Sequence, residues 1–335
     1  MSIQPLVSVV MPYYNAEEFI FEAIESILNQ SYDNIEVLLI NDHSSDSSQE
    51  IVDRFVRDHN NIRNLLNESN VGLAASINKA IGAAKGEFIA RMDADDIMTS
   101  DRIEKQVSFL MNHPEIDVVG GSLQYFGQSS FYNAFPTDHD SCMAQLCFSV
   151  CFGHPSVMFR TEIFSDPDNL YVESLSQYSE DYDLWCKLSI KYQFANLKDT
   201  LVKYRTYPLG VKTEAEALRR RNSRAIREKY LKANFKDYNT EYYELHHRIS
   251  RYTIDNVNAI KQAKQYLDYL LSLDSDLNDR ALRRMVAKVF FELCYTKIYL
   301  GRSVHWIYLK SFYWRSYLPS ILTYGKFVYK TLVLR

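Results

Sequence analysis

The sequence lacks the features that mark membrane-spanning proteins and several common nucleotide-binding folds. Its 335 residues contain no uninterrupted apolar stretch near the roughly 18 residues that a bilayer-spanning helix needs. The N-terminus has neither the basic region nor the cleavage site of a secretory signal peptide. Only 10 residues are glycine, and neither a Gly-x-Gly-x-x-Gly motif nor a Walker lysine loop occurs. The sequence therefore argues against a transmembrane segment and against phosphate binding by a glycine-rich loop.

Cysteine is also scarce. The five cysteines form no Cys-x-x-Cys pair and are odd in number. This pattern predicts reduced, buried thiols in a cytoplasmic protein rather than a disulfide framework. Hydrophobic residues make up 47% of the chain and charged residues 24%, which is ordinary for a globular protein. The composition excludes a disordered chain, which could not bury enough apolar surface to offset its ordering entropy.

Acidic residues are nearly missing from the C-terminal segment 280–335. This segment carries eleven Lys or Arg against the single acid Glu292, and it contains thirteen aromatic residues, whereas the whole chain has a net charge of −4. Basic residues attract anionic lipid, and Trp and Tyr favour the membrane interface. We expect a helical bundle that docks on the cytoplasmic face of the inner membrane; a helical domain with an aromatic core and solvated lysines is the alternative. We expect no nucleic-acid partner, because no RNA-binding motif occurs and the rest of the chain is acidic.

The first third of the chain alternates short apolar runs with helical spacings of apolar residues. The predicted strands are 6–11, 35–40, 62–66, 87–92 and 118–121, and the predicted helices are 16–29, 47–59, 73–84 and one from Asp101 to before Pro114, with Glu104 as its capping-box partner. This alternation predicts an α/β fold with a parallel or mixed sheet and helices on both faces. A further helix is expected over 181–192, and the chain is expected to be helical beyond Thr213.

Polar side chains gather where three of the predicted strands end. The clusters lie at residues 12–15, 41–46 and 93–96. In open α/β sheets, ligands bind at the carboxyl ends of the strands, so these clusters indicate one shared site.

The third cluster places three carboxylates within four residues: Asp93, Asp95 and Asp96. These groups repel one another unless a positive charge lies between them. Oxygen ligands favour Mg²⁺ or Mn²⁺, and a site with few protein ligands completes its shell with water and substrate phosphates. The cluster therefore predicts a divalent metal and a nucleoside diphosphate ligand. The alternative is that these acids cap a helix or a loop.

Taken together, these motifs resemble the inverting nucleotide-sugar glycosyltransferases of family 2, which have the GT-A fold, a Rossmann-like mixed sheet flanked by helices. The resemblance covers about residues 5–210, and within the family it is strongest to bacterial enzymes that extend lipooligosaccharide or capsule glycans. It implies a glycosyltransferase domain at 1–210, with a donor half at about 1–121 and an acceptor half at about 122–210, followed by the helical, basic-aromatic region 211–335. The segments that carry it are Val7 to Asn15, Asn41-Asp42-x-Ser44, Asn70-x-Gly72, Gly86 to Asp96 and Glu180-Asp181-Tyr182-x-Leu184-Trp185.

The resemblance also implies a donor-binding role for several residues. Tyr14 would stack on the base of the donor, with uracil expected, and Pro12 would set the turn beside it. Asn15 would lie in the same donor site. Asp42 would accept a hydrogen bond from the base N3–H, which suits a carboxylate because an ionised acid only accepts.

At the acid cluster, the resemblance makes Asp95 the direct metal ligand. Asp93 would contact the ribose or the metal and its water shell, and Asp96 would support the ligands from behind. Arg91 precedes the acids and would either orient one of them or neutralise their charge.

The acceptor side is expected near Glu180 and Asp181. By resemblance Asp181 is the general base that deprotonates the attacking hydroxyl, with Glu180 as the alternate; simple helix capping is the structural alternative. Trp185 would offer a flat apolar wall to a sugar ring, and His154 is a candidate for sugar contacts or a structural histidine. A single in-line displacement would convert an α-linked donor into a β-linked product.

The expected reaction moves a sugar from UDP-GlcNAc, UDP-GalNAc or UDP-Gal to a glycan or lipid-linked glycan in lipooligosaccharide, O-antigen or capsule synthesis. A non-catalytic carbohydrate-binding or scaffolding protein is the alternative. One departure supports that alternative: many members of the family carry a His two residues after the Tyr204-Arg205 pair, and here Tyr207 stands in its place. Tyrosine is a poor metal ligand at neutral pH, so the metal would be held more weakly or Tyr207 would bond a phosphate.

Overall fold

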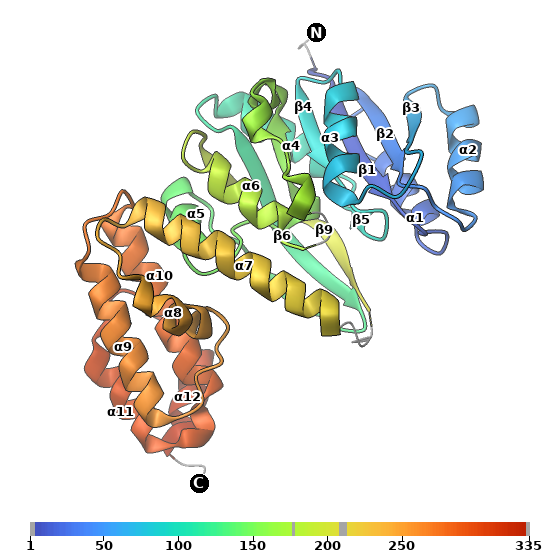
Figure 1. Cartoon of the computed structure of the whole chain (residues 1–335). Helices are drawn as coiled ribbons and strands as arrows, with labels where there is room; N and C mark the ends of the chain where they lie inside the picture. Colours follow the sequence, from blue (N-terminus) through green and yellow to red (C-terminus); the bar gives the residue numbers. More distant parts are fainter. Residues whose placement is uncertain (1–3, 176–177, 208–212, 333–335) are drawn as a thin grey trace. The chain divides into compact units, whose positions relative to one another are not determined.

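The computed structural model describes residues 4–175, 178–207 and 213–332 (Figure 1). Contacts divide the chain into two compact units. The sheet unit comprises Met1–Cys142 and Val150–Ser223, and the helical unit comprises Met143–Ser149 and Arg224–Arg335. The division thus falls later in the chain than the predicted boundary at residue 210, which itself lies outside the described residues.

A nine-stranded mixed sheet forms the centre of the sheet unit, with the order β3-β2-β1-β4-β8-β6-β9-β5 and with β7 paired to β6. The strands β3, β2, β1 and β4 run parallel, β8 is antiparallel to β4 and β6, and β9 is parallel to β6. This confirms the predicted mixed sheet. The strands are β1 (Val7–Tyr13), β2 (Ile35–Asn41), β3 (Ile62–Leu66), β4 (Phe88–Arg91), β5 (Ile97–Met98), β6 (Val118–Gly127), β7 (Tyr132–Asn133), β8 (Met158–Arg160) and β9 (Phe194–Thr206).

Helices cover both faces of this sheet, as the alternating pattern predicts. Side chains of a strand alternate between its faces. Val7, Val9 and Met11 of β1 therefore share one face and join a core cluster with α1 and α4, whereas α3 packs on β1 and β2. The helices are α1 (Ile20–Leu28), α2 (Ser48–Asp58), α3 (Leu73–Ala83), α4 (Arg102–Asn112), α5 (His139–Leu146), α6 (Glu180–Leu188) and α7 (Thr213–Asn234), with short 3₁₀ turns at His154–Ser156, Thr161–Ser165, Pro167–Asn169 and Glu173–Leu175.

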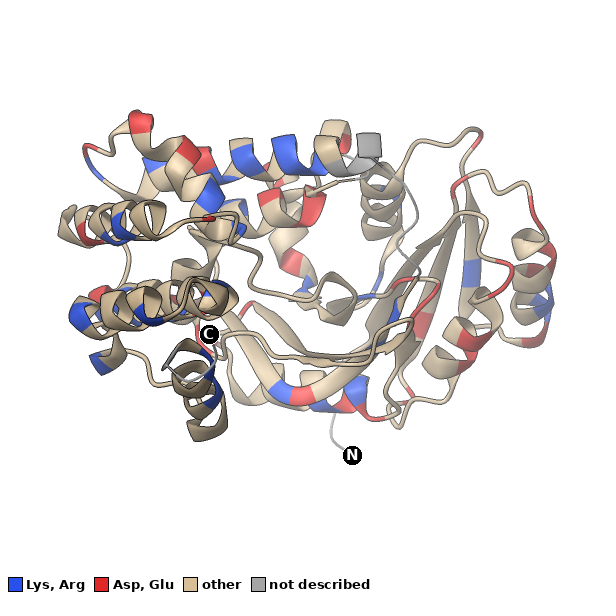
Figure 2. Ribbon diagram, turned by 90° about the horizontal axis from the view of Figure 1, so that it is seen from below, with Lys and Arg blue, Asp and Glu red and all other residues tan. Residues whose placement is uncertain are grey.

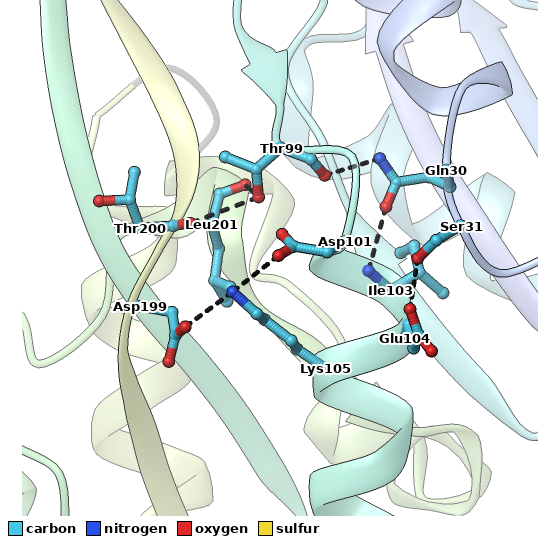
Figure 3. A network of polar contacts seen from close by, with 10 residues as sticks. All are labelled: Gln30, Ser31, Thr99, Asp101, Ile103, Glu104, Lys105, Asp199, Thr200 and Leu201. Atoms are coloured by element: carbon cyan, nitrogen blue, oxygen red, sulfur yellow. Dashed lines mark hydrogen bonds and ion pairs between the residues drawn. The ribbon is translucent and has the colours of Figure 1, made fainter.

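The predicted capping box at the start of α4 is wrong. Asp101 makes no side-chain cap, and Glu104 instead accepts a hydrogen bond from Ser31 Oγ at 2.6 Å (Figure 3). The cap comes from another element: Gln30 Oε1 accepts the backbone N–H of Ile103 at 3.1 Å. The free N–H groups of a helix start need an acceptor, and here tertiary structure supplies it in place of the local sequence.

The helical unit has an aromatic core. This is a feature of the alternative to membrane docking, a helical domain with an aromatic core and solvated lysines. Phe290, Phe291, Tyr308 and Phe327 are buried, and the rings of Phe291 and Phe327 lie 5.5 Å apart. In the described part of the chain, no helix combines the length and hydrophobicity of a membrane crossing. The helices are α8 (Tyr243–Ser250), α9 (Val257–Ser272), α10 (Asp279–Thr296), α11 (Arg302–Ser311) and α12 (Ile321–Leu332), with 3₁₀ turns at Thr240–Tyr242, Ile298–Leu300 and Tyr313–Arg315.

All five cysteines are buried and free of disulfides, as predicted for the thiols themselves. Burial raises the pKa of the Cys147, Cys151 and Cys294 thiols above their usual range. These groups therefore stay protonated at neutral pH and act as small apolar side chains.

Candidate active site

A pocket of about 470 Å³ opens in the sheet unit beyond the carboxyl end of β4. It gathers residues from the β4 end, the 3₁₀ turn at His154–Ser156, the start of α6 and strand β9. The structure thus brings together side chains that are far apart in the sequence. Six of the residues that the sequence singled out line it: Arg91, Asp93, Asp95, His154, Glu180 and Asp181.

The three acids after β4 form a group that suits a divalent cation. One oxygen each of Asp93, Asp95 and Asp96 lies within 4.8 Å of the other two. Burial and the neighbouring charges of Asp93 and Asp95 raise the pKa of Asp96 to about 9. Asp96 Oδ2 is buried and has no hydrogen-bond partner among the described residues. Mg²⁺ and Mn²⁺ prefer oxygen ligands, and these three carboxyl groups offer only oxygen. The residues present therefore fit such an ion.

Strand β9 holds this acidic loop in place. The backbone N–H of Arg205 donates to Asp96 Oδ1 at 2.7 Å, and Arg205 Nε donates to the carbonyl of Asp95 at 2.8 Å. The guanidinium lies between the rings of Phe19 and Phe126, at 4.7 and 4.5 Å from their centroids. Arg205 is therefore a positioning residue. In the sequence, Arg205 was noted only as part of the Tyr204-Arg205 pair, and no role was predicted for it.

Tyr207 reaches the same group of acids. Its hydroxyl donates to Asp95 Oδ2 at 2.8 Å, and its ring packs edge-on against Phe19 at 5.6 Å. Burial, together with the hydrogen bond to Asp95, raises the pKa of Tyr207 above its usual range. The phenol therefore remains a hydrogen-bond donor to the acid that is the expected metal ligand.

Arg91 lies beneath the acids, with 2% of its surface exposed. Its Nη2 atom lies 2.5 Å from Asp93 Oδ1, so Arg91 both orients and neutralises that acid. Its Nε and Nη1 atoms have no hydrogen-bond partner within the described residues. Because Arg91 lines the pocket, its buried positive charge favours an anionic ligand there.

Glu180 and Asp181 open α6 on another side of the pocket. Asp181 Oδ1 accepts the N–H of Tyr182 at 2.7 Å, so part of the capping alternative holds. Ser179, which precedes the pair, has a φ of 84° and makes no side-chain cap. Burial and the charge of Asp181 raise the pKa of Glu180 to about 7, and burial also raises the pKa of Asp181. Glu180, with a pKa near neutrality, and Asp181, with a pKa raised above its ordinary value, are suited to proton transfer.

The predicted role of Trp185 as a wall for a sugar is wrong. Its ring is fully buried and packs against Phe152 at 5.1 Å and Phe159 at 5.8 Å. The side chain points from α6 into the core, so it supports the pocket from below.

His154 lines the pocket and bonds Tyr171, whose hydroxyl lies 2.9 Å from Nε2. Burial, aided by the charge of Arg91, lowers the pKa of His154 well below its usual range, so the ring is neutral. The Nε2 atom is thus hydrogen-bonded within the protein, as expected of a structural histidine. The contact of His154 with an acceptor sugar stays a prediction.

The donor-side residues lie where β1 ends. Tyr14 is 53% exposed, as a stacking platform requires. Pro12 lies inside β1, paired with Ile40, so the prediction that it sets the turn is wrong. The turn comes at Asn15, which has a φ of 48° and whose Oδ1 accepts the N–H of Ser45 at 2.8 Å. Asn15 thereby ties the loop after β1 to the loop after β2, and its donor contact stays a prediction.

Asp42, at the β2 end, is occupied by donors of the chain itself. Its oxygens accept from Asn67 Nδ2 and from the N–H groups of Val71 and Gly72, each at 2.9 Å. These bonds fix the segment before α3, where Gly72 has a φ of 89°. Asp42 is thus a structural clamp, and its contact with a base stays a prediction.

Comparison with known proteins agrees with this geometry. The profile described as "Glycosyl transferase family 2" matches residues 8–166. An uncharacterized glycosyltransferase of Haemophilus influenzae is 33% identical over 61% of this chain and 66% of its own length. A second, MJ1057 of Methanocaldococcus jannaschii, is 32% identical over 60% of this chain and 71% of its own length. TuaG of Bacillus subtilis, whose name refers to teichuronic acid biosynthesis, is 36% identical over 32% of this chain and 43% of its own length.

Solved structures share the fold. S. aureus TarS 1-349 in complex with UDP-GlcNAc gives a TM-score of 0.59 at 17% identity, over 92% of this chain and 89% of that one. The mannosyltransferase PcManGT from Pyrobaculum calidifontis, in complex with GDP-Man and Mn²⁺, gives 0.52 at 16% identity, over 98% of this chain and 88% of that one. A longer TarS structure is matched at 18% identity with a TM-score of 0.57, over 85% of this chain and 52% of that one.

The mixed sheet, its flanking helices and the helical C-terminal region define the α/β fold of the GT-A class. Within that class, the chain belongs to glycosyltransferase family 2. It spans about two thirds of the H. influenzae relative and about half of the longer TarS structure.

Proposed function

We propose that the protein is a metal-dependent inverting glycosyltransferase that uses a nucleotide-sugar donor. The observation that carries the proposal is the composition of the pocket beyond β4. Its lining includes Asp93 and Asp95 of the acid group that suits a cation, the acid pair Glu180 and Asp181, and the buried Arg91. Transfer of a sugar from a diphosphate needs each of these parts.

Asp93, Asp95 and Asp96 would hold the cation, with Mn²⁺ or Mg²⁺ as the expected ions. A divalent cation bound there neutralises the negative charge that develops on the leaving diphosphate. The bound Mn²⁺ of PcManGT supports this assignment. Arg91 contributes a fixed positive charge from the lining of the same pocket.

Asp181 accepts the proton of the acceptor hydroxyl as that oxygen attacks the anomeric carbon. Glu180, with one buried oxygen that has no partner among the described residues, is the alternate base. The raised pKa of both acids makes them stronger bases than exposed carboxylates. Attack opposite the diphosphate inverts the anomeric centre, so an α-linked donor yields a β-linked product.

The donor is proposed to be UDP-GlcNAc, UDP-GalNAc or UDP-Gal, and the acceptor a glycan or lipid-linked glycan of a bacterial surface polysaccharide. The complex of TarS with UDP-GlcNAc supports a UDP-sugar, and the name of TuaG supports a polysaccharide product. The exposed ring of Tyr14 at the end of β1 is the proposed platform for the base.

Donor turnover tests the proposal directly. The purified protein is incubated with each UDP-sugar, with and without Mn²⁺, and release of UDP is measured, first with water and then with glycan acceptors. We expect metal-dependent release that falls about 10²–10⁴-fold in Asp181→Asn, while donor binding by thermal shift is retained. Donor binding with no turnover under any condition would favour the non-catalytic alternative, and the absence of both binding and turnover would refute the proposed UDP-sugar donor.

A further inference from the structure

The helical unit contains a second pocket, of about 610 Å³, whose lining is dominated by arginine. Three of these arginines lie in the first two turns of α10, and the fourth closes the 3₁₀ turn Tyr313–Arg315. The pocket thus joins two segments of the C-terminal third of the chain. Its basic and aromatic lining residues are Arg280, Arg283, Arg284, Arg315 and Tyr317.

Most of these arginines lack an acid partner. Arg283 pairs with Asp279 at 2.8 Å. No carboxylate pairs with Arg280, Arg284 or Arg315 among the residues that the structure describes; Arg315 lies instead 5.1 Å from the Phe312 ring. Lys and Arg also recur along the other helices of this unit (Figure 2). Like charges facing one pocket repel each other, and an anion bound among them relieves that repulsion.

Beside this pocket the chain exposes large aliphatic side chains. Leu318 lines the pocket and is 77% exposed, while Ile321 and Leu322 at the start of α12 are 92% and 78% exposed. Scattered exposed aliphatics are ordinary, but these three follow one another within five residues. We call Leu318, Ile321 and Leu322 the aliphatic tip. An arginine pocket next to this tip is complementary to a surface that offers both phosphate groups and hydrocarbon.

We propose that this pocket binds the phosphate of an anionic phospholipid headgroup while Leu318, Ile321 and Leu322 insert into the outer part of the acyl region. A bilayer supplies the two chemistries side by side, since its phosphates lie directly above its hydrocarbon. A free phosphate ion would use the arginines but leave the aliphatic tip in water. A nucleic acid would do the same.

Vesicle binding by the full chain tests this proposal without involving donor turnover, so its outcome is independent of the proposed function. The protein is sedimented with vesicles of phosphatidylglycerol and phosphatidylcholine, and with phosphatidylcholine alone, at physiological salt. We expect binding to the anionic vesicles only. The triple variant Arg280→Ala, Arg284→Ala, Arg315→Ala should bind at least about tenfold more weakly, because each basic residue at the surface adds to the attraction.

A matched control removes the same charge elsewhere in the helical unit. Lys229, Lys232 and Lys261 are exposed and lie outside the segment 280–335. Their triple replacement by Ala should change vesicle binding by less than about twofold. If the lysine control lost as much vesicle binding as the arginine variant, the pocket would not be the lipid-binding site.

The aliphatic tip is tested separately with Leu318→Ser, Ile321→Ser, Leu322→Ser. This variant should still bind anionic vesicles at low salt and lose that binding at physiological salt, where the wild type keeps it. Three results would overturn the proposal: a wild type that does not bind anionic vesicles, a tip variant that binds as well as the wild type, or stabilisation by inorganic phosphate or an RNA oligonucleotide without vesicle binding. Far-UV circular dichroism and urea unfolding confirm that each variant is folded.

Discussion

Buried acids follow strands β2 and β4, which lie on either side of β1 in the sheet, and the two acids have opposite hydrogen-bonding environments. Asp42, after β2, receives three hydrogen bonds from Asn67, Val71 and Gly72. Asp96, after β4, receives one, from the backbone of Arg205, and leaves its other oxygen without a partner in the described part of the chain. Both side chains are almost fully buried.

The difference separates a structural acid from a ligand-binding acid. A carboxylate whose oxygens are met by the chain's own N–H groups is already stabilised as an anion, so it can hold loops together. Carboxylates that crowd one another, with oxygens left unmet, are stable as anions only when a cation joins them, and without one their pKa rises. In a strand-end site, the number of protein donors on each acid therefore indicates its role better than its burial does.

The largest expected effect falls on the crowded acids. Asp95→Asn should lower metal-dependent UDP release by at least about a hundredfold, because it removes a charged oxygen from the expected metal site. The same change should leave the unfolding free energy of the metal-free protein equal or slightly higher, since a like charge beside Asp93 and Asp96 is lost. The measurements are UDP release, Mn²⁺ titration and urea unfolding. Asp33→Asn, an exposed acid, is the matched control; undiminished turnover in Asp95→Asn would remove this acid from the metal site.

Asp42→Asn should show the opposite pattern, with a loss of stability. The new amide would turn an NH₂ group toward donors that now face a carboxylate oxygen, which should lower the unfolding free energy by about 2–4 kcal/mol. Urea unfolding measures this loss, and Asp33→Asn should stay within about 0.5 kcal/mol of the wild type. If Asp42→Asn proved as stable as the control while donor affinity fell, Asp42 would belong with the ligand-binding acids.

Glu180 extends the comparison to pH, because it too has an oxygen without a partner in the described residues. Its pKa rises from the ordinary 4.5 to about 7 on folding. Between these values the folded protein binds more protons than the unfolded chain, so stability is lost as the pH rises from about 4.5 to about 7. For the metal-free protein this loss is up to about 3 kcal/mol.

Glu180→Gln, which stays neutral, should flatten this part of the stability profile. Unfolding free energies at several pH values, measured in the presence of a chelator, provide the check. Identical pH profiles for wild type and variant would show that the acid titrates in the fold as it does in water.

The smallest effect is expected at Tyr207, whose hydroxyl donates to Asp95 of the crowded acids. Tyr207→His should tighten Mn²⁺ binding severalfold, because a neutral imidazole can ligate the ion and a protonated phenol is a poor ligand. Tyr207→Phe, as control, should stay within about twofold of the wild type. Mn²⁺ titration by calorimetry measures both, and a Phe variant that loses binding would make the Tyr207 hydroxyl part of the metal site.

The sequence predicted the donor half of the fold well and the acceptor half poorly. Strand β3 has the predicted bounds, and α2, α3 and α4 differ from theirs by a residue or two. These elements bury one side or both, so their apolar periodicity is strong. Strand β9 was missed, because charged residues such as Lys198, Asp199 and Lys203 interrupt its apolar pattern where it runs along the surface.

For the site, chemistry was predictable and orientation was not. The acids after β4 were found because three carboxylates in four residues have no structural use at a strand end, and Glu180 and Asp181 were found through the family resemblance. Whether Trp185 is buried, and whether Asp42 accepts hydrogen bonds from the chain, depends on which side of each element faces the core. Residues distant in the sequence decide that orientation. The contribution of Arg205 was hidden for the same reason.

The burial of all five native thiols has a practical consequence for spectroscopy. A maleimide reagent reacts with exposed thiolates, and each native sulfur is buried. A single cysteine introduced at the highly exposed position 318 would therefore take a fluorophore on an otherwise unaltered chain. An environment-sensitive dye placed there would brighten on entering lipid, so the chain can be labelled for such work without first removing its own cysteines.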